Sequence, residues 1–344
     1  MLPWLSFAAD PGRVHTDGRL SRGAVEGARE QVAQRLGARP REVVFTSGAT
    51  EAIVAAVWGA TERRRHIVVP AVEHSAVRDS SAAFGEVTHV GVDRLGRVDV
   101  DEVLDAVRPG ETALVHIQWA NHEVGTLQPV VRIVAGCRAR GALVHVDAAC
   151  TAGHVPIDFG ALGADLMSVS AHKLGGPQGV GALLIRRGLR LRPLLVGGEQ
   201  ERSRRAGMEN VAGIVGFGMA ALMPADENRE RVQTEAMLAA ATAVEGVVAY
   251  GDTDRRLPHI VCLGVAGVEA EAVLLGLDQA GIAAHSGSAC SSESLEPSPV
   301  LAAMGVEAER SLRLSVGWST TGDDVDAFGA AFPAVVGRLR ALRS

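Results

Sequence analysis

The amino-acid sequence predicts an α/β protein with a mostly parallel, doubly wound sheet in a large domain and a smaller α+β domain at the C-terminal end. Short apolar segments of strand length alternate with segments of helical periodicity along the N-terminal part of the chain. Glycine-containing turns follow several of these segments. A length of 344 residues is enough for about two domains.

The composition favours a small-molecule enzyme over a protein that binds nucleic acid or membrane. Apolar residues make up 47% of the chain, charged residues make up 22%, and the net charge is −6. No uncharged apolar run is long enough to span a membrane, and the N-terminal segment lacks the features of a signal peptide, so we expect a cytoplasmic protein. Because no C-x-x-C pair occurs, we expect free thiols and no metal site. The cysteines are Cys137, Cys150, Cys262 and Cys290.

The first expected strand leads into a candidate phosphate site. We expect a helix over residues 21–36, a strand over 42–45 and an apolar helix over 52–58. The turn TSGATEA joins the strand to the second helix, where free backbone N–H groups and the positive end of the helix dipole favour phosphate. Small turns of this kind also occur without a ligand. The candidate contacts are Gly48, Ala49 and Thr50.

His74 follows the next expected strand, HIVVP, in the sequence VEHSAV. A lone histidine after a strand is usually structural, but open α/β sheets bind ligands at their strand ends, which favours a ligand role here. Alternation of strands and helices through this region predicts a parallel sheet. The expected elements are strands over residues 66–70, 87–92, 113–119 and 143–146, and a helix over 130–140.

Lys173 lies in SVSAHKLGGPQGVG, between an apolar strand over residues 164–169 and a glycine-rich turn. We expect Lys173 to be half-buried at this position. Burial favours the neutral amine, which condenses with an aldehyde, and the obvious aldehyde is pyridoxal phosphate. The alternative is an ordinary surface lysine at a strand exit. Ser170 and His172 are its polar neighbours.

Asp147 ends the strand LVHVD and precedes Lys173 by 26 residues. Successive strands of a parallel sheet would deliver this carboxylate and the lysine to the same edge. A pyridoxal ring withdraws electrons while its ring nitrogen is protonated, and a buried aspartate keeps that proton in place. The alternative for Asp147 taken alone is a helix-capping or turn aspartate.

The second domain begins where the composition becomes charged, around residues 224–231, which divides the chain into 1–225 and 226–344. Its polar loop SGSACSSESLEPSP carries Cys290, a thiol that a mobile loop could move into and out of a cleft. Arg313 lies in a strand and could hold a carboxylate through two parallel hydrogen bonds, although such arginines are often only solvated. The expected elements are a helix to about residue 244, a strand over 259–263, a helix over 269–280 and a strand near 311–316.

Several motifs together resemble those of the pyridoxal-phosphate cysteine desulfurases. They are TSGATEA, VEHSAV, WANHEVGT, HVDA, SAHKLGGPQGVGALL, SGSACSS and RLSVG, in that order. From about residue 14 onward, the chain resembles a divergent member of the group I, NifS/IscS-like branch of the class V aminotransferase superfamily. This resemblance implies a homodimer of fold type I that converts L-cysteine to L-alanine. Sulfur would pass to an enzyme cysteine persulfide and then to an acceptor protein or small acceptor.

The resemblance also implies roles for individual residues. Lys173 would form a Schiff base with the cofactor and later move the proton of the substrate's α-carbon. His74 would stack on the pyridine ring and assist proton transfer, and Cys290 would attack the substrate's sulfur. The other cofactor contacts would be Ala49, Thr50, Ser170 and His172 at the phosphate and Asp147 at the ring nitrogen. The substrate contacts would be Arg313, at the carboxylate, with Asn121 and His122.

Four departures from the family pattern affect expected polar contacts. His122 replaces an asparagine at the cofactor and could donate to its phenolic oxygen, where Cys150 replaces a glutamine. Met208 replaces a threonine that reaches the neighbouring subunit's phosphate, and the opening Asp-x-x-Ala-Thr-Thr segment is missing. Loss of a hydrogen bond to a charged group costs on the order of 1.5–3 kcal/mol, so cofactor affinity and substrate choice are expected to differ. A supplier of sulfur to one specialised pathway is the preferred interpretation.

Two other functions compete with cysteine desulfurase. A C–S or selenocysteine β-lyase would use the same cofactor without needing Cys290 as a nucleophile. A non-catalytic, desulfurase-like subunit of a sulfur-transfer complex would tolerate the altered cofactor contacts.

Overall fold

The computed structural model describes the chain apart from residue 8, residues 287–296 and residues 343–344. The described residues form two compact units. Most residues up to 225 form the first unit, and those from 226 onward belong to the second. Two short segments, Gly91–Asp99 and Ala120–Gln128, also belong to the second unit. The expected division of the chain at residue 225 assigns both segments to the first domain.

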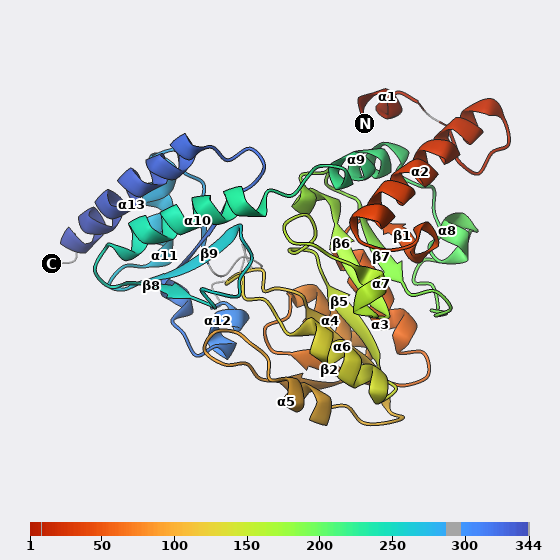
Figure 1. Ribbon diagram of the computed structural model, residues 1–344, viewed down its shortest axis with the longest axis horizontal. Helices are drawn as coiled ribbons and strands as arrows, with labels where there is room; N and C mark the ends of the chain where they lie inside the picture. Colours follow the sequence, from red (N-terminus) through yellow and green to blue (C-terminus); the bar gives the residue numbers. More distant parts are fainter. Residues whose placement is uncertain (8, 287–296, 343–344) are drawn as a thin grey trace. The chain divides into compact units, whose positions relative to one another are not determined.

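The described part of the first unit contains a seven-stranded sheet with the order β1-β7-β6-β5-β4-β2-β3 (Figure 1). Among these strands β7 alone runs in the opposite direction to the rest, so the expected mostly parallel sheet is confirmed. The strands are β1 (Val43–Thr46), β2 (His66–Pro70), β3 (Glu86–Val90), β4 (Thr112–Gln118), β5 (Leu143–Asp147), β6 (Leu166–Ser170) and β7 (Gly181–Ile185).

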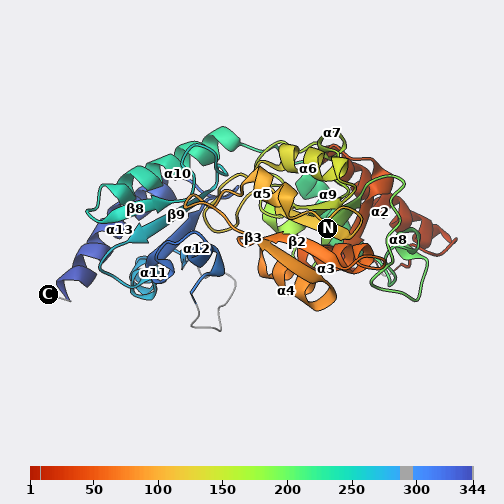
Figure 2. The same ribbon diagram turned by 90° about the horizontal axis from the view of Figure 1, so that it is seen from below.

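The central strands are apolar because helices cover both faces of the sheet. Every residue of β2 is buried, and its side chains alternate between the two faces. Figure 2 shows α3 and α4 on one side of the sheet and α6 and α9 on the other. The helices are α1 (Leu2–Leu5), α2 (Thr16–Arg35), α3 (Ala49–Ala60), α4 (Ser75–Phe84), α5 (Val100–Asp105), α6 (Val130–Ala139), α7 (Phe159–Leu162), α8 (Gln200–Ser203) and α9 (Val211–Ala221), with 3₁₀ turns η1 (Pro40–Glu42) and η2 (Ala171–Leu174).

The sequence analysis did not predict strand β7. The glycine-rich stretch before it is typical of a turn, and no strand was assigned after that turn. Gly175 and Gly179 have φ angles of 78° and 75°, a left-handed region in which glycine is the favoured residue. These residues bend the chain back after η2, so that β7 pairs antiparallel with both β6 and β1. The turn therefore brings the end of β1 close to the end of β6.

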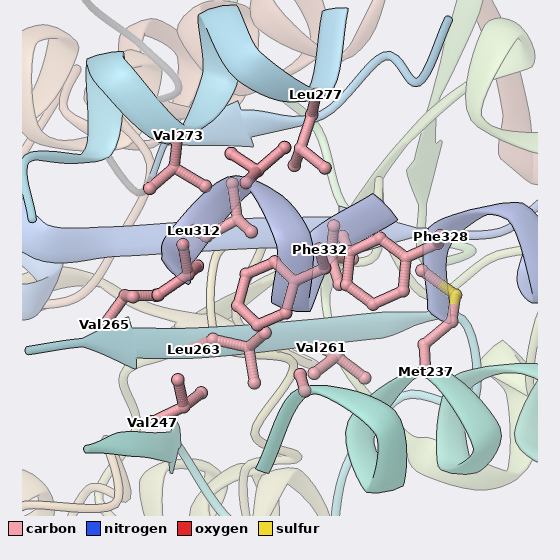
Figure 3. Close-up of a cluster of buried hydrophobic side chains, with 14 of the residues drawn as sticks. Met237, Val247, Val261, Leu263, Val265, Val273, Leu277, Leu312, Phe328 and Phe332 are labelled. Carbon is pink, nitrogen blue, oxygen red and sulfur yellow. The ribbon is translucent and has the colours of Figure 1, made fainter. Parts of the chain in front are cut away.

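The second unit is an antiparallel sheet packed against helices, as expected for an α+β domain. Its strands follow the order β10-β11-β9-β8. Figure 3 shows Phe328 and Phe332 of the C-terminal helix in the core with Leu263 and Leu312 of the sheet. The elements are β8 (Val247–Tyr250), β9 (Ile260–Val265), β10 (His285–Ser286), β11 (Ser311–Ser315), α10 (Glu227–Thr242), α11 (Ala270–Gln279), α12 (Pro299–Ala303), η3 (Ala308–Arg310) and α13 (Gly322–Ala341).

Helix α13 was also not expected, although its sequence carries helix signals. Thr321 and Asp324 form a capping box at its start. Val325, Phe328 and Phe332 then follow at helical spacing and are buried. Among the described helices, none combines the length and apolar character required to cross a membrane.

Candidate active site

The carboxyl ends of the parallel strands gather the predicted residues of the first unit at one edge of the sheet. Gly181 of β7 pairs with Thr46 at the end of β1 and with Ser170 at the end of β6. Asp147, at the end of β5, pairs with Ser168 of β6. Because neighbouring strands lie about 4.8 Å apart, this pairing places the ends of β1, β6 and β5 within a small region.

The candidate phosphate turn lies directly after β1, at the N-terminus of α3. Gly48 is the cap residue and offers no side-chain hydrogen bond, so the predicted contacts Ala49 and Thr50 lie in a first turn without a side-chain cap. A Cβ on Gly181 would lie 2.6 Å from the carbonyl oxygen of Val169 and 2.8 Å from the Cα of Gly48. Only glycine therefore allows β7 to support the turn at this distance.

Glu51, in the same first turn, is held by partners that offset its charge. Its Oε2 accepts a hydrogen bond from the backbone N–H of Ser47 at 2.8 Å, and its Oε1 accepts one from Arg205 Nε at 2.9 Å. Burial disfavours the ionised carboxyl, but the bonds from Arg205 and Ser47 outweigh it and lower the pKa of Glu51. The negative charge of Glu51 is thus paired with Arg205 beside the candidate phosphate turn.

Asp147 is the buried carboxylate at this edge. The residue is only 8% exposed. Its Oδ1 accepts hydrogen bonds from the N–H of Ala149 at 2.9 Å and from Ser168 Oγ at 3.1 Å. Its Oδ2 takes part in neither bond. One oxygen is therefore fixed by the protein, and the other is the acceptor that a ligand can use.

Lys173 lies on η2, immediately after β6, and it is exposed rather than half-buried as expected. A 3₁₀ turn has three residues per turn, so Ala171 and Leu174 share one side while His172 and Lys173 face away from it. Ala171 is fully buried, whereas His172 and Lys173 are both exposed. Within the first unit alone, the lysine is therefore presented to solvent, and its backbone carbonyl lies 3.1 Å from His154 Nε2.

Ser170 and His172 form a polar pair next to the lysine. Ser170 Oγ lies 2.8 Å from His172 Nδ1. Partial burial, and then the positive charge of Lys173, lower the pKa of His172. A neutral imidazole and a hydroxyl can both offer hydrogen bonds to a phosphate oxygen.

His74 caps α4, just beyond the end of β2. Its Nδ1 accepts a hydrogen bond from the N–H of Ala76 at 3.0 Å, so in the neutral ring the proton lies on Nε2. Two bonds brace this segment: the backbone N–H of Gln118 donates to Glu73 Oε1 at 2.6 Å, and Gln118 Nε2 donates to the carbonyl of Val72 at 2.9 Å. The sequence analysis did not identify Glu73 or Gln118 as supporting residues. The position of Glu73 directly before His74 could have indicated such a role.

The cysteines differ in their surroundings. Cys137 and Cys262 are fully buried, and burial raises the pKa of each thiol, that of Cys137 to about 12. Cys150 lies in the turn after β5 and is partly exposed, so it is not buried as the other two are. Cys290 lies outside the described residues.

The second unit holds the remaining predicted residues. Arg313 in β11 donates from Nη1 to the backbone carbonyl of His122 at 3.2 Å, a bond that uses one of its five N–H groups. Asn121 Oδ1 accepts hydrogen bonds from the backbone N–H groups of Glu123 and Val124, each at 2.8 Å. Asn121 thus shapes the turn on which His122 sits, next to the strand that carries Arg313.

His122 is buried beside an acidic residue. Its Nε2 lies 3.5 Å from Glu123 Oε1, and Ser298 Oγ donates to the other carboxylate oxygen of Glu123 at 2.6 Å. These contacts fix the imidazole within the second unit.

Sequence reasoning also missed a buried histidine pair in the first unit. His116 of β4 and His145 of β5 are paired in register, with their Nδ1 atoms 3.0 Å apart. Both are fully buried, and neither Nε2 has a hydrogen-bond partner among the described residues. Burial lowers the pKa of both rings, that of His145 to about 4. The histidines in the otherwise apolar strand sequences LVHIQ and LVHVD could have indicated this buried pair.

The residues at this edge fit a phosphorylated pyridine aldehyde. The first turn of α3 lacks a side-chain cap, and an added Cβ on Gly48 would meet no atom within 4 Å, so the turn is open to a phosphate. Asp147 Oδ2 suits a protonated ring nitrogen, and Lys173 supplies the amine that an aldehyde requires. Lys173 is the only lysine in the sequence, in a chain with 34 lysine and arginine residues in total.

Comparisons with known proteins agree with this chemistry. The family model described as aminotransferase class-V matches residues 6–328. A cysteine desulfurase from Nostoc sp. is 42% identical over 361 residues, covering 99% of this chain and 90% of that protein. A solved structure of a NifS-like protein has a TM-score of 0.90 at 31% identity and covers 98% of this chain and 93% of its own. A structure described as SspA in complex with cysteine has a TM-score of 0.81 at 29% identity, with coverages of 91% and 92%.

Proposed function

The chain belongs to the class-V aminotransferase family, and we propose that it is a pyridoxal-phosphate-dependent cysteine desulfurase. It would convert L-cysteine to L-alanine and pass the sulfur through a persulfide on Cys290 to an acceptor. The observation that carries this proposal is the register that puts Asp147, Ser170 and the α3 turn at one sheet edge, next to the only lysine of the chain. Similarity to cysteine desulfurases over nearly the full length supports it.

The cofactor would be held by residues of the first unit. The N–H groups of Ala49 and Thr50, together with Ser170 and His172, would bind the phosphate, and Lys173 would hold the aldehyde carbon. Asp147 Oδ2 would accept the proton of the ring nitrogen. When bound, pyridoxal phosphate withdraws electrons from the substrate's α-carbon and side chain.

The chain's own residues would handle the protons. The amine of Lys173, once released, would move the proton of the substrate's α-carbon. His74 would lie against the pyridine ring with its Nδ1 engaged by Ala76, which leaves Nε2–H as its proton-donating group. Partly exposed Cys150 stands where relatives bond the cofactor's phenolic oxygen, and a thiol donates more weakly than an amide.

Sulfur transfer would occur on Cys290. Its thiolate would attack the substrate's sulfur, so that an S–S bond forms while the bond between sulfur and Cβ breaks. The electron pair of the broken bond stays with the substrate carbon, which takes up protons and leaves as alanine. An acceptor thiolate would then attack the outer sulfur of the persulfide and release the Cys290 thiolate.

The substrate's carboxylate would bind Arg313, with Asn121 and His122 nearby in the same unit. The hydrogen bond from Arg313 to His122 supports this role, because it fixes the guanidinium while leaving other N–H groups for a carboxylate. On the sequence resemblance we also propose a cytoplasmic homodimer. Met208, which is 68% exposed, would lie at its subunit contact.

A covalent trapping experiment tests the proposal, because the chain has one lysine. Purified protein is loaded with pyridoxal phosphate, reduced with borohydride and mapped by peptide mass spectrometry. We expect one pyridoxyl adduct on a side chain, at Lys173, and none in Lys173→Arg. An N-terminal adduct is distinguished by its peptide, and absence of the Lys173 adduct would overturn the proposal.

Product analysis separates the competing activities. The loaded wild-type protein should form alanine and sulfide in equal amounts from L-cysteine with a thiol reductant. Cys290→Ser should keep the Lys173 adduct and lose sulfide formation. Pyruvate and ammonia formed without need of Cys290 would indicate a β-lyase, and an adduct without any product would indicate a non-catalytic subunit.

A further inference from the structure

Asp147 and Ser168 face each other across two parallel strands. They are paired in register, and both are buried, Ser168 completely. The backbone N–H of Ala148 also donates to the carbonyl of Ser168 at 3.0 Å, which extends the ladder to the residue after Asp147. The serine hydroxyl is therefore held at a fixed place relative to the carboxylate.

The two oxygens of Asp147 are used differently. Oδ1 accepts both the N–H of Ala149 and the hydroxyl of Ser168, whereas Oδ2 accepts no hydrogen bond from any residue that the structure describes. The bond from Ala149 closes a local turn two residues long. The bond from Ser168 comes from another strand, so the pair of bonds fixes the plane of the carboxylate.

A buried hydroxyl in a strand is costly unless it forms a hydrogen bond. Ser168 meets this requirement by donating to Asp147. This bond holds the carboxylate of Asp147 in one orientation and so fixes the direction of its remaining acceptor, Oδ2.

We propose that Ser168 is a positioning residue, whose hydroxyl orients Asp147 so that Oδ2 meets the protonated ring nitrogen of the cofactor. This inference rests on the proposed function, because it requires pyridoxal phosphate at this edge. It assigns Ser168 no contact with the cofactor or the substrate.

A thermodynamic cycle between Ser168 and the ring nitrogen tests the proposal. The dissociation constants of pyridoxal phosphate and of its 1-deaza analogue, in which carbon replaces the ring nitrogen, are measured by equilibrium titration of the apo-protein. Ser168→Ala should weaken pyridoxal phosphate by about 5- to 20-fold, because a charge-assisted bond that orients Asp147 is lost. It should leave binding of the 1-deaza analogue unchanged, since that analogue presents no N–H to Asp147.

Two further variants control the experiment. Ser21 is fully buried in α2, and its hydroxyl has no hydrogen-bond partner among the described residues, so Ser21→Ala removes a buried hydroxyl without affecting Asp147. It should change neither dissociation constant. Ser168→Thr keeps the hydroxyl and should retain most of the preference for pyridoxal phosphate. If Ser168→Ala yields no folded protein, the same cycle is measured with Ser168→Cys. Cysteine resembles serine in shape, but its thiol is a weak hydrogen-bond donor.

The outcomes distinguish this inference from the proposed function. If Ser168→Ala weakens both ligands equally, Ser168 has only a structural role and the inference is wrong. The same conclusion follows if neither ligand is weakened. If wild-type protein does not bind pyridoxal phosphate, the proposed function itself fails, and the inference fails with it.

Discussion

Arg29 and Glu201 form a buried, two-pronged ion pair in the first unit, with Nη1 and Nη2 each 2.7 Å from a carboxylate oxygen. The same carboxylate accepts the N–H of Phe45 at 2.9 Å, and Arg29 Nη1 also donates to the carbonyl of Val43 at 3.0 Å. The pair therefore anchors β1, which leads into the candidate phosphate turn. Glu201 itself has a left-handed backbone, with φ of 49°.

We predict that Glu201→Gln strongly destabilises the protein. The change removes the buried counter-ion of Arg29 and leaves only Glu26, whose half-exposed carboxylate lies 3.1 Å from Nε, so we expect a loss of about 3 kcal/mol. The free energy of unfolding, measured by urea titration, checks this. Glu307→Gln is the control, because the Arg310–Glu307 pair is exposed and should contribute less than about 1 kcal/mol. Equal losses in the two variants would contradict the prediction.

Gly181→Ala should weaken cofactor binding as well as stability. Its new Cβ would lie within 3 Å of Val169 and Gly48, so β7 or the phosphate turn must move. We expect a loss of about 1–3 kcal/mol of stability and at least a tenfold higher dissociation constant for pyridoxal phosphate. Gly23→Ala in α2 is the matched control, since no atom lies within 4 Å of its added Cβ. That variant should be slightly stabilised, and a cofactor affinity equal to wild type in Gly181→Ala would refute the close-packing argument.

The sequence predicted the parallel core well because its strands are short, apolar and separated by helices. The strand over 66–70 coincides with β2, and the helix over 130–140 differs from α6 by one residue. Strand β7 was missed because its identity depends on pairing with two strands rather than on its own composition.

Motifs indicate the candidate site residues but not the residues that support them. Ser168 supports Asp147 across a strand pair, and no local pattern marks it. Lys173 was expected to be half-buried, yet the 3₁₀ turn after β6 directs it outward. Glu201, whose backbone is left-handed, pairs with Arg29, 172 residues earlier in the chain, and no local pattern predicts that contact.

The buried histidine pair predicts that the first unit loses stability in acid. Burial lowers the folded-state pKa of His116 and His145, that of His145 to about 4, while an unfolded histidine titrates near 6.5. The unfolded chain thus binds more protons below about pH 6.5, and stability is lost as the pH falls from there toward 4. For His145 the loss amounts to roughly 3 kcal/mol.

Urea titrations across this pH range check the prediction. His145→Gln removes one titrating ring and should flatten the decline in the free energy of unfolding between pH 6.5 and 4. His89→Gln is the control, because His89 is exposed in β3 and should leave the decline unchanged. A decline as steep in His145→Gln as in wild type would show that the pair is not responsible.

Arg313→Lys should separate substrate binding from cofactor binding. A lysine keeps the positive charge but lacks the planar guanidinium, which can hold a carboxylate through two parallel hydrogen bonds. The guanidinium can do so while another of its N–H groups donates to the backbone carbonyl of His122. We expect the KM for L-cysteine to rise by about 10- to 100-fold, with a smaller change in kcat and an unchanged dissociation constant for pyridoxal phosphate. Arg310→Lys, three residues away and exposed in its pair with Glu307, should behave as wild type in all three measurements. An unchanged KM in Arg313→Lys would remove Arg313 from the substrate site, and a weakened cofactor affinity would show that the variant disturbs more than the carboxylate contact.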